Sequence, residues 1–385
     1  MVKVQNMKIL LVGEYSRLHN SLKEGLTELG HDVTIMASGD GFKNYPVDIK
    51  INHSFNNFFL KKLKVLIYKL TKIDLGAFQM YIKAKSNLKT LGNFDVVQLI
   101  NESPLKITPK YEIKFINSLS KQTKKIYLLS CGIDYTCMKY MINGGFKYSI
   151  MTPYLNDKSL KNRYRFQLMY LSKPYKRLHD FILTKCNGII SSDIDYHIPF
   201  LKKEKYLRLI PNAVNSDKIH YIPISIEKKI KIFHGVNKFA YHKKGNLFFD
   251  DAISILKDKY PDKVEVFRTE NIPYKDYIKL YDSCHILLDQ VYGYDQGYNA
   301  LEAMAKGKVV FTGAEQEWLD HYNLEEDTVA INALPDVNYL VKKLEWLIEN
   351  PDQINKISKN ARQFIETHHD YKEVAKQYLA TWQNN

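Results

Sequence analysis

The chain has 385 residues, 45% of them hydrophobic and 25% charged, with a formal net charge of +14. That length suits two domains rather than one, and the composition excludes a disordered or fibrous protein. No apolar run reaches the ~20 residues of a membrane-spanning helix, and the N-terminal run is too short for a signal peptide. The 4 cysteines have neither zinc-site nor disulfide spacing, so we expect reduced thiols in a cytoplasmic protein.

The positive charge is concentrated in the first half of the chain. Residues 1–215 have a net charge of +18, and residues 216–385 a net charge of −4. A basic half predicts an anionic partner, such as lipid headgroups, nucleic acid or an acidic polymer.

Strands and helices alternate from the start of the chain. Lys8–Val12 predicts a strand, Arg17–Leu29 a helix, and Asp32–Met36 a second strand. Three later segments are apolar on both faces, as in parallel strands covered by helices: residues 94–100, 125–129 and 186–192. This alternation is typical of a doubly wound α/β domain.

A second α/β series begins after a boundary near residues 209–215. Strands are predicted at residues 230–233, 264–267, 285–289 and 309–312, with helices between them and a helical C-terminus after Asp336. We therefore predict two doubly wound, Rossmann-like domains that face a cleft. Their predicted limits are residues 1–212 and 213–368, and residues 369–385 are predicted to form a helix that packs back on the N-terminal domain.

The segment Cys284–Gly313 is the most informative part of the chain. The pattern predicts a buried strand, a Gly- and Tyr-rich turn, a helix that begins near Tyr298, and a second buried strand. Backbone N–H groups and the positive end of a helix dipole converge in such a turn, which predicts an anion site. Glu302, one turn into the helix, could accept hydrogen bonds from a sugar diol. Together these features indicate a nucleotide ligand.

Three motifs carry a resemblance to a known family. The boundary Ile210–Val214 (IPNAV), the helix Ala300–Val310 (ALEAMAKGKVV) and the tail Asn360–Phe364 (NARQF) resemble those of the GT-B glycosyltransferases, specifically the retaining family 4. The resemblance implies an acceptor-binding N-terminal domain and a C-terminal domain that binds a nucleotide-sugar donor as substrate. It implies no metal and no other cofactor.

The resemblance also assigns roles to individual residues. Glu302 would bind the donor ribose. Lys244, the lysine of a Lys–Gly pair, would hold the diphosphate, and Lys238 stands where the family has an arginine, so it keeps the charge but loses the bidentate fork. Backbone N–H groups at three consecutive positions would bind the phosphate: Gly297, Tyr298 and Asn299.

The turn departs from the family pattern. The family has a second glutamate eight positions before the ribose-binding one, facing the transferred sugar, and this chain has Tyr294 there. The adjacent Asp295 would either replace that glutamate or be a solvated loop residue. By its position after a strand, the segment around Glu270 is expected near the nucleotide base.

Two residues of the N-terminal half follow predicted strands. Gly13 would either approach the ligands across the cleft or simply form a tight turn. Asp134 would either accept the acceptor's proton or cap the following helix. Asp193 and Asp195 look like a metal-binding DxD pair, but a loop or cap role is expected for them.

Two basic stretches, Phe55–Leu70 and Lys158–Arg177, interleave aromatic residues with cations. Both are predicted to be helices with an apolar face and a basic flank, a pattern suited to an anionic membrane surface. The alternative is that their apolar faces belong to the core. The first interpretation predicts peripheral contact with the inner face of the membrane and a lipid-linked acceptor.

The sequence thus predicts an enzyme that transfers a sugar, with retention, from a nucleotide sugar to a hydroxyl of a carbohydrate or lipid-linked acceptor, in surface-polysaccharide or glycolipid assembly. An inactive GT-B protein that serves as a scaffold or partner subunit is the alternative, motivated by Tyr294 and Lys238. Nucleic-acid binding is not expected, because no recognition motif accompanies the basic residues.

Overall fold

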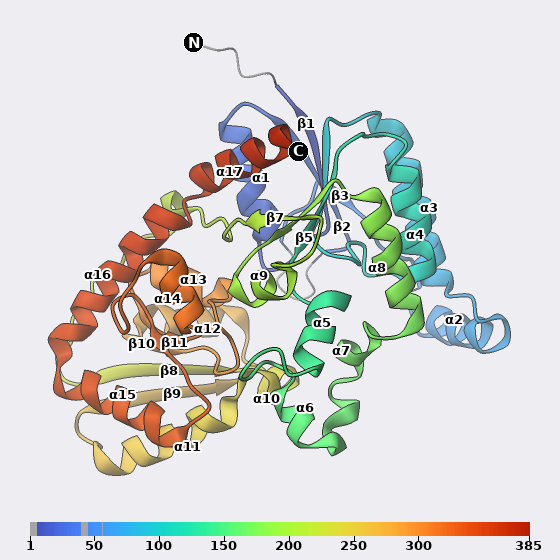
Figure 1. Ribbon diagram of the computed structural model, residues 1–385. Helices are drawn as coiled ribbons and strands as arrows, with labels where there is room; N and C mark the ends of the chain where they lie inside the picture. Colours follow the sequence, from blue (N-terminus) through green and yellow to red (C-terminus); the bar gives the residue numbers. More distant parts are fainter. Residues whose placement is uncertain (1–5, 40–44, 56) are drawn as a thin grey trace.

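The computed structural model describes residues 6–39, 45–55 and 57–385. Two parallel sheets form the centres of two domains (Figure 1). The first has the order β3-β2-β1-β4-β5-β6-β7, and the second has the order β12-β11-β10-β8-β9. Both are doubly wound orders, so the predicted fold class is confirmed.

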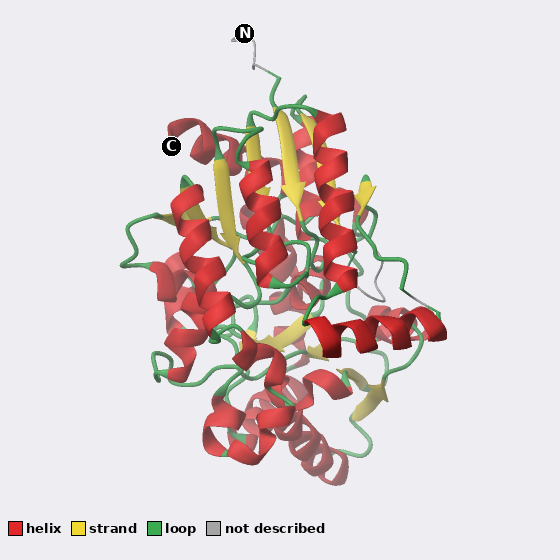
Figure 2. Cartoon of the chain, turned by 90° about the vertical axis from the view of Figure 1, so that its right-hand side faces the viewer, coloured by secondary structure: helices red, strands yellow, loops and turns green. Residues whose placement is uncertain are grey.

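Apolar strands form the N-terminal sheet, which is covered on both faces. Helices α3, α4 and α8 form a row against one face, and α1 packs with α17 on the other (Figures 1 and 2). The strands are β1 (Lys8–Val12), β2 (Asp32–Ala37), β3 (Ile49–Lys50), β4 (Val96–Leu99), β5 (Ile126–Ser130), β6 (Gly188–Ser191) and β7 (Tyr206–Leu209). The helices are α1 (Leu18–Glu28), α2 (Phe58–Thr71), α3 (Leu75–Leu91), α4 (Pro109–Leu119), α5 (Tyr135–Ile142), α6 (Thr152–Asn156), α7 (Arg165–Met169), α8 (Lys173–Lys185) and α9 (Ile194–Phe200).

The C-terminal sheet is built in the same way. Its strands are β8 (Ile230–Val236), β9 (Val264–Glu270), β10 (Ile286–Leu288), β11 (Val309–Thr312) and β12 (Ile331–Asn332). Its helices are α10 (Tyr241–Lys244), α11 (Asn246–Lys259), α12 (Tyr274–Ser283), α13 (Tyr298–Ala305), α14 (Gln316–Tyr322), α15 (Val337–Glu349) and α16 (Pro351–His368). β10 is shorter than the strand predicted over residues 285–289, although Asp289 N–H still donates to Phe311 O over 3.0 Å.

The chain crosses between the domains twice, and the two crossings touch. Val214 N–H donates to His369 O over 2.8 Å, and His369 Nδ1 lies 2.8 Å from Asn212 O. After the second crossing, α17 (Tyr371–Asn384) packs against α1 of the N-terminal domain. The last helix therefore ties the end of the chain to its beginning.

One predicted helix is wrong. Lys158–Arg177 is divided between a 3-10 turn (Lys158–Asn162), α7 and the start of α8. Tyr164, Tyr170 and Tyr175 are buried, so the aromatic residues of this stretch belong to the core. Pro174, at the start of α8, lacks the N–H that a continuous helix would need there. Within the described ranges, no helix is both long and apolar enough to cross a bilayer.

Candidate functional site

A cavity of about 590 Å³ lies at the carboxyl edge of the C-terminal sheet. β8 and β10 are neighbours there although β9 lies between them in sequence, so the strand order reverses at this point, where ligands bind in open α/β sheets. Part of the wall is apolar and includes Val236, Ile272, Ile278, Leu287 and Leu288. The polar side chains converge from α10, β10 and α13: Lys244, Asp289, Asn299 and Glu302.

Three of these polar side chains form one network. Lys244 Nζ donates to Asp289 Oδ1 over 2.8 Å, and Asn299 Nδ2 donates to the same oxygen over 3.0 Å. Asp289 is only 4% exposed, and these two hydrogen bonds satisfy its buried side chain. Gly245 is required next to Lys244, because its φ is +67° and an added Cβ would lie 2.7 Å from Val291 Cβ. Asp289 was not predicted, although a polar residue just after a buried strand could have indicated it.

Helix α13 presents Glu302 and its own N-terminus to the site. Its apolar residues are buried, and Asn299 and Glu302 are the polar positions of the helix that line the cavity. Tyr298 and Asn299 lie in the first turn, where backbone N–H groups have no acceptor within the helix. The Tyr298 side chain points elsewhere, since its hydroxyl lies 2.8 Å from Ser21 Oγ of α1. Gly297 is the N-cap, and an added Cβ there would meet nothing within 4 Å.

Lys238 and Glu270 are paired with each other. Lys238 Nζ lies 2.5 Å from Glu270 Oε1, and the lysine side chain is 67% exposed. Neither residue lines the cavity, although their neighbours Asn237 and Thr269 do. Lys238 would therefore have to leave Glu270 to reach a bound diphosphate.

The turn before α13 is held by the N-terminal domain. The hydroxyl of Tyr294, which is 2% exposed, accepts a hydrogen bond of 2.9 Å from Lys147 N–H. Its ring packs on Phe146 and Tyr148. Asp295 Oδ2 accepts from Ile194 N–H over 3.0 Å, so this aspartate is not a solvated loop residue. The position expected to face the transferred sugar thus forms a contact between the domains.

Three carboxyl groups are enclosed at this contact. Burial raises the pKa of Asp295 to about 6. Burial, together with the Asp295 charge, raises the pKa of Asp195 to about 7, and the pKa of Asp193 also rises well above its usual range. Asp193 caps α9 by accepting from Tyr196 N–H, so the cap role expected for this residue is confirmed.

These carboxyls predict a pH-dependent stability. Because their pKa values are raised above the ordinary 3.8, the folded protein retains protons that the unfolded chain releases. Their favourable contribution is complete below about pH 4 and lost as the pH rises through about 6 to 7. We expect the melting temperature to fall from about pH 5 to about pH 8 through this cluster. The melting temperature of Asp195→Asn should fall less over this pH range than that of the parent protein. Asp276→Asn, which changes an exposed residue of α12, should show the same fall as the parent. An equal fall in Asp195→Asn and the parent would contradict the assignment.

Gly13 and Asp134 make their contacts within the N-terminal domain. Gly13 has φ +93°, an added Cβ would lie 2.3 Å from Ile100 Cγ2, and its N–H already donates to Met36 O. Asp134 is 1% exposed and caps α5 by accepting from Cys137 N–H over 2.7 Å. Its other oxygen accepts from Ser130 Oγ over 2.5 Å. Of the two roles expected for each residue, the structure therefore shows the tight turn at Gly13 and the N-cap at Asp134.

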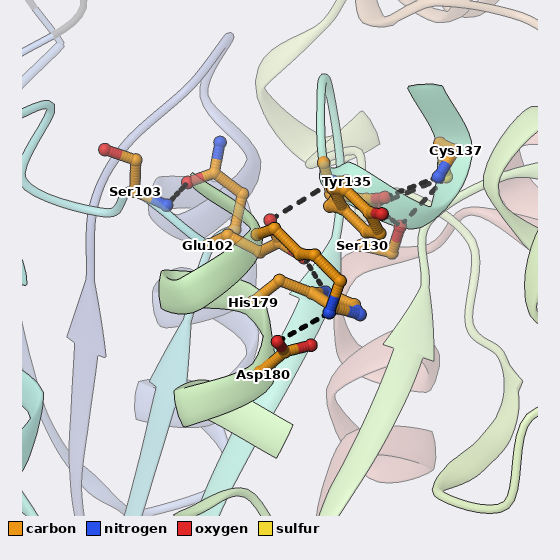
Figure 3. A network of polar contacts seen from close by, with 10 residues as sticks. Glu102, Ser103, Ser130, Tyr135, Cys137, His179 and Asp180 are labelled. Carbon is orange, nitrogen blue, oxygen red and sulfur yellow. Dashed lines mark hydrogen bonds and ion pairs between the residues drawn. The ribbon is translucent and has the colours of Figure 1, made fainter. Parts of the chain in front are cut away.

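Glu102 and His179 form a buried acid–base pair in the same domain (Figure 3). Glu102, which follows β4, is 2.5 Å from His179 Nδ1 of α8 and accepts from Tyr135 N–H over 3.1 Å. Burial raises the pKa of Glu102. Burial alone would lower the pKa of His179, but the carboxylate outweighs it and the net pKa is raised. The pair joins three elements at the carboxyl edge of the N-terminal sheet, and neither residue was predicted.

A second cavity of about 590 Å³ lies between α1 and the first domain crossing. Two of its acidic residues are already paired: Glu24 with Lys218 over 2.8 Å, and Asp48 with Lys23 over 2.6 Å. It lies away from the sheet edges where ligands bind in such folds.

Comparisons with known proteins agree with this geometry. Residues 234–380 match the Glycosyl transferase-like family, a range that contains the cavity's polar residues. HepE of Anabaena, solved with UDP and glucose, is similar in structure with a TM-score of 0.61 and 12% identity, over 99% of this chain and 100% of that one. Sucrose-phosphate synthase of Thermosynechococcus elongatus has a TM-score of 0.60 and 15% identity, over 98% and 99%.

A glycosyltransferase of Rickettsia africae is also similar, with a TM-score of 0.53 and 15% identity over 99% of this chain and 98% of that one. No curated protein matches the sequence. The two facing, doubly wound domains and these likenesses define the GT-B fold, which confirms the fold expected from the sequence motifs.

Proposed function

We propose that this protein is a glycosyltransferase that moves a sugar from a nucleoside-diphosphate sugar to a hydroxyl acceptor. The observation that carries the proposal is the cavity at the β8/β10 switch point, where Glu302 and the Lys244–Asp289–Asn299 network converge. The same segment matches the glycosyltransferase family. HepE, with its UDP and glucose, supports uridine diphosphate as the first nucleotide to test.

Each polar group has a role in this proposal. The Glu302 carboxylate accepts hydrogen bonds from the two ribose hydroxyls, and such charge-assisted bonds are stronger than those to a neutral acceptor. Lys244 and the first-turn N–H groups of α13 hold the diphosphate, whose negative charge grows as the sugar departs. Asp289 is a positioning residue, because it orients both Lys244 and Asn299.

In this proposal the N-terminal domain binds the acceptor. Its hydroxyl bonds to the anomeric carbon on the same face from which the diphosphate leaves, so the configuration is retained. A carbohydrate or lipid-linked acceptor in surface-polysaccharide or glycolipid assembly fits the basic half of the chain. Asp134 would accept the hydroxyl proton only by giving up its capping bonds. Closure of the domains would exclude water and so limit donor hydrolysis.

Glu302→Ala should weaken binding of uridine diphosphate. The charged hydrogen bonds to ribose contribute about 1.5–3 kcal/mol, so the Kd should rise roughly 10- to 100-fold. Titration calorimetry with uridine, guanosine and adenosine diphosphates measures this effect and identifies the base.

The matched control is Glu265→Ala, which removes an exposed glutamate of β9 and should leave the Kd unchanged. Unaltered binding by Glu302→Ala would show that this helix does not hold the ribose.

A scaffold role is the second candidate, and Tyr294 favours it. Its buried ring and its bond to Lys147 N–H fill the position where the family has a glutamate facing the sugar. Nucleoside diphosphate release from a panel of donors, with acceptors supplied, separates the two functions. Release from one donor supports the enzyme; binding without release from any donor supports the scaffold.

A further inference from the structure

Helix α2 exposes apolar side chains along its whole length. None of its residues is buried, and it projects at the right-hand edge of the molecule beyond α3 and α4 (Figure 1). Residue 56, just before it, lies outside the described residues. Asn57 Oδ1 caps the start of the helix by accepting from Leu60 N–H over 2.8 Å. A helix that packed in the usual way would bury its apolar stripe.

Four of the exposed apolar residues of α2 form one continuous stripe, and Phe58, Val65 and Tyr68 are exposed on its other faces. The four recur at i, i+4, i+7 and i+11, the spacing that places side chains on one helical face: Phe59, Leu63, Leu66 and Leu70. Their exposed fractions are 80%, 47%, 54% and 76%. Leu60 and Ile67, on an adjacent face of the helix, are half-buried. The stripe therefore faces away from the protein.

Charge decides which occupant fits this stripe. α2 contains Lys61, Lys62, Lys64 and Lys69 and no acidic residue. A second copy of the helix would bring lysines against lysines with no carboxylate between them, which disfavours self-association. An anionic bilayer complements both features, because headgroups attract the lysines while acyl chains receive the apolar stripe.

We propose that α2 is a membrane-docking helix, and that it lies in the interface of an anionic bilayer with the Phe59–Leu70 stripe inserted. Lys62 and Lys69 flank the stripe and reach the lipid phosphates. This inference names the surface that would bring a lipid-linked acceptor to the protein. It does not depend on the proposed transferase activity, since the helix is remote from the β8/β10 cavity in the fold and carries none of its residues.

Vesicle co-sedimentation of the full chain tests the proposal. Binding is expected to phosphatidylcholine vesicles that contain about 30% phosphatidylglycerol and not to phosphatidylcholine alone. Phe59→Ser/Leu70→Ser should reduce the partition coefficient about tenfold or more, because two inserted side chains are lost. Lys62→Gln/Lys69→Gln should weaken binding and reduce its salt dependence.

The matched control is Leu247→Ser/Ile255→Ser, which changes two apolar residues of α11 that are 55% and 41% exposed. It should bind vesicles like the parent protein. Leu66→Cys, labelled with a polarity-sensitive dye, should report a blue shift on anionic vesicles, and the native cysteines should not compete because all 4 are buried.

Three results would overturn the proposal: no binding of the parent to anionic vesicles, equal binding by the stripe variant, or a dimer in solution that the stripe variant converts to a monomer. Uridine diphosphate binding, measured on the same samples, keeps this outcome separate from that of the proposed function. Stripe variants should retain nucleotide binding and the parent melting temperature.

Discussion

Lys244→Gln is expected to reduce kcat about 100- to 1000-fold, the effect of removing one group that stabilises charge in a transition state. Lys244 lines the cavity and is oriented by Asp289, which is 4% exposed. Glutamine can still donate to Asp289, so the folded structure should persist while the positive charge facing the diphosphate is lost. Steady-state kinetics with the donor identified by the binding panel gives the ratio.

Lys238→Gln is the matched control. Lys238 is exposed and paired with Glu270 outside the cavity wall, so we expect a loss of less than about tenfold. A loss as large as that of Lys244→Gln would mean that Lys238 leaves Glu270 on donor binding, as the family resemblance implied. No loss in either variant would remove Lys244 from the site.

Trp382→Ala is expected to lower the free energy of unfolding by about 3–5 kcal/mol, the usual cost of deleting a fully buried tryptophan. Trp382 is fully buried, and its ring lies 6.3 Å from that of Tyr127 in the N-terminal sheet and 5.5 Å from that of Tyr378. Its carbonyl accepts hydrogen bonds from Lys125 Nζ over 2.6 Å and from the Tyr127 hydroxyl over 3.1 Å.

Urea unfolding with fluorescence and circular dichroism measures this loss. Lys376→Ala, on the exposed side of α17, should change the free energy of unfolding by less than about 0.5 kcal/mol. If Trp382→Ala behaved like Lys376→Ala, α17 would contribute little to the N-terminal domain, and the link between the chain ends would be incidental.

Most of the fold could be predicted from local patterns. Runs such as Ile126–Leu129 are apolar on both faces because both sides of a parallel sheet are covered, and that signal needs no distant partner. The prediction of one helix over Lys158–Arg177 was wrong because interleaved cations and tyrosines fit a surface helix and a folded core equally well. Only the packing of Tyr164 and Tyr170 distinguishes the two.

The candidate site also has residues that local motifs predict and contacts that only the folded structure shows. Glu302, Asn299 and Lys244 were predicted from motifs within one short segment each, and all three line the cavity. Tyr294 was recognised as a departure from the family pattern, but its partner is Lys147, 147 positions away in the other domain. Asp295 likewise bonds to Ile194, 101 positions away.

The sequence by itself determined the alternation of strands and helices and three polar residues that line the cavity: Lys244, Asn299 and Glu302. The strands and helices follow from apolar periodicity, and the three polar residues lie in motifs that resemble those of the GT-B glycosyltransferases. Only the tertiary structure decided that Lys238 pairs with Glu270 and that α2 leaves its stripe uncovered. Both outcomes depend on which segments, distant in sequence, come into contact in the folded chain. Those contacts set the pairing and the exposure of a side chain.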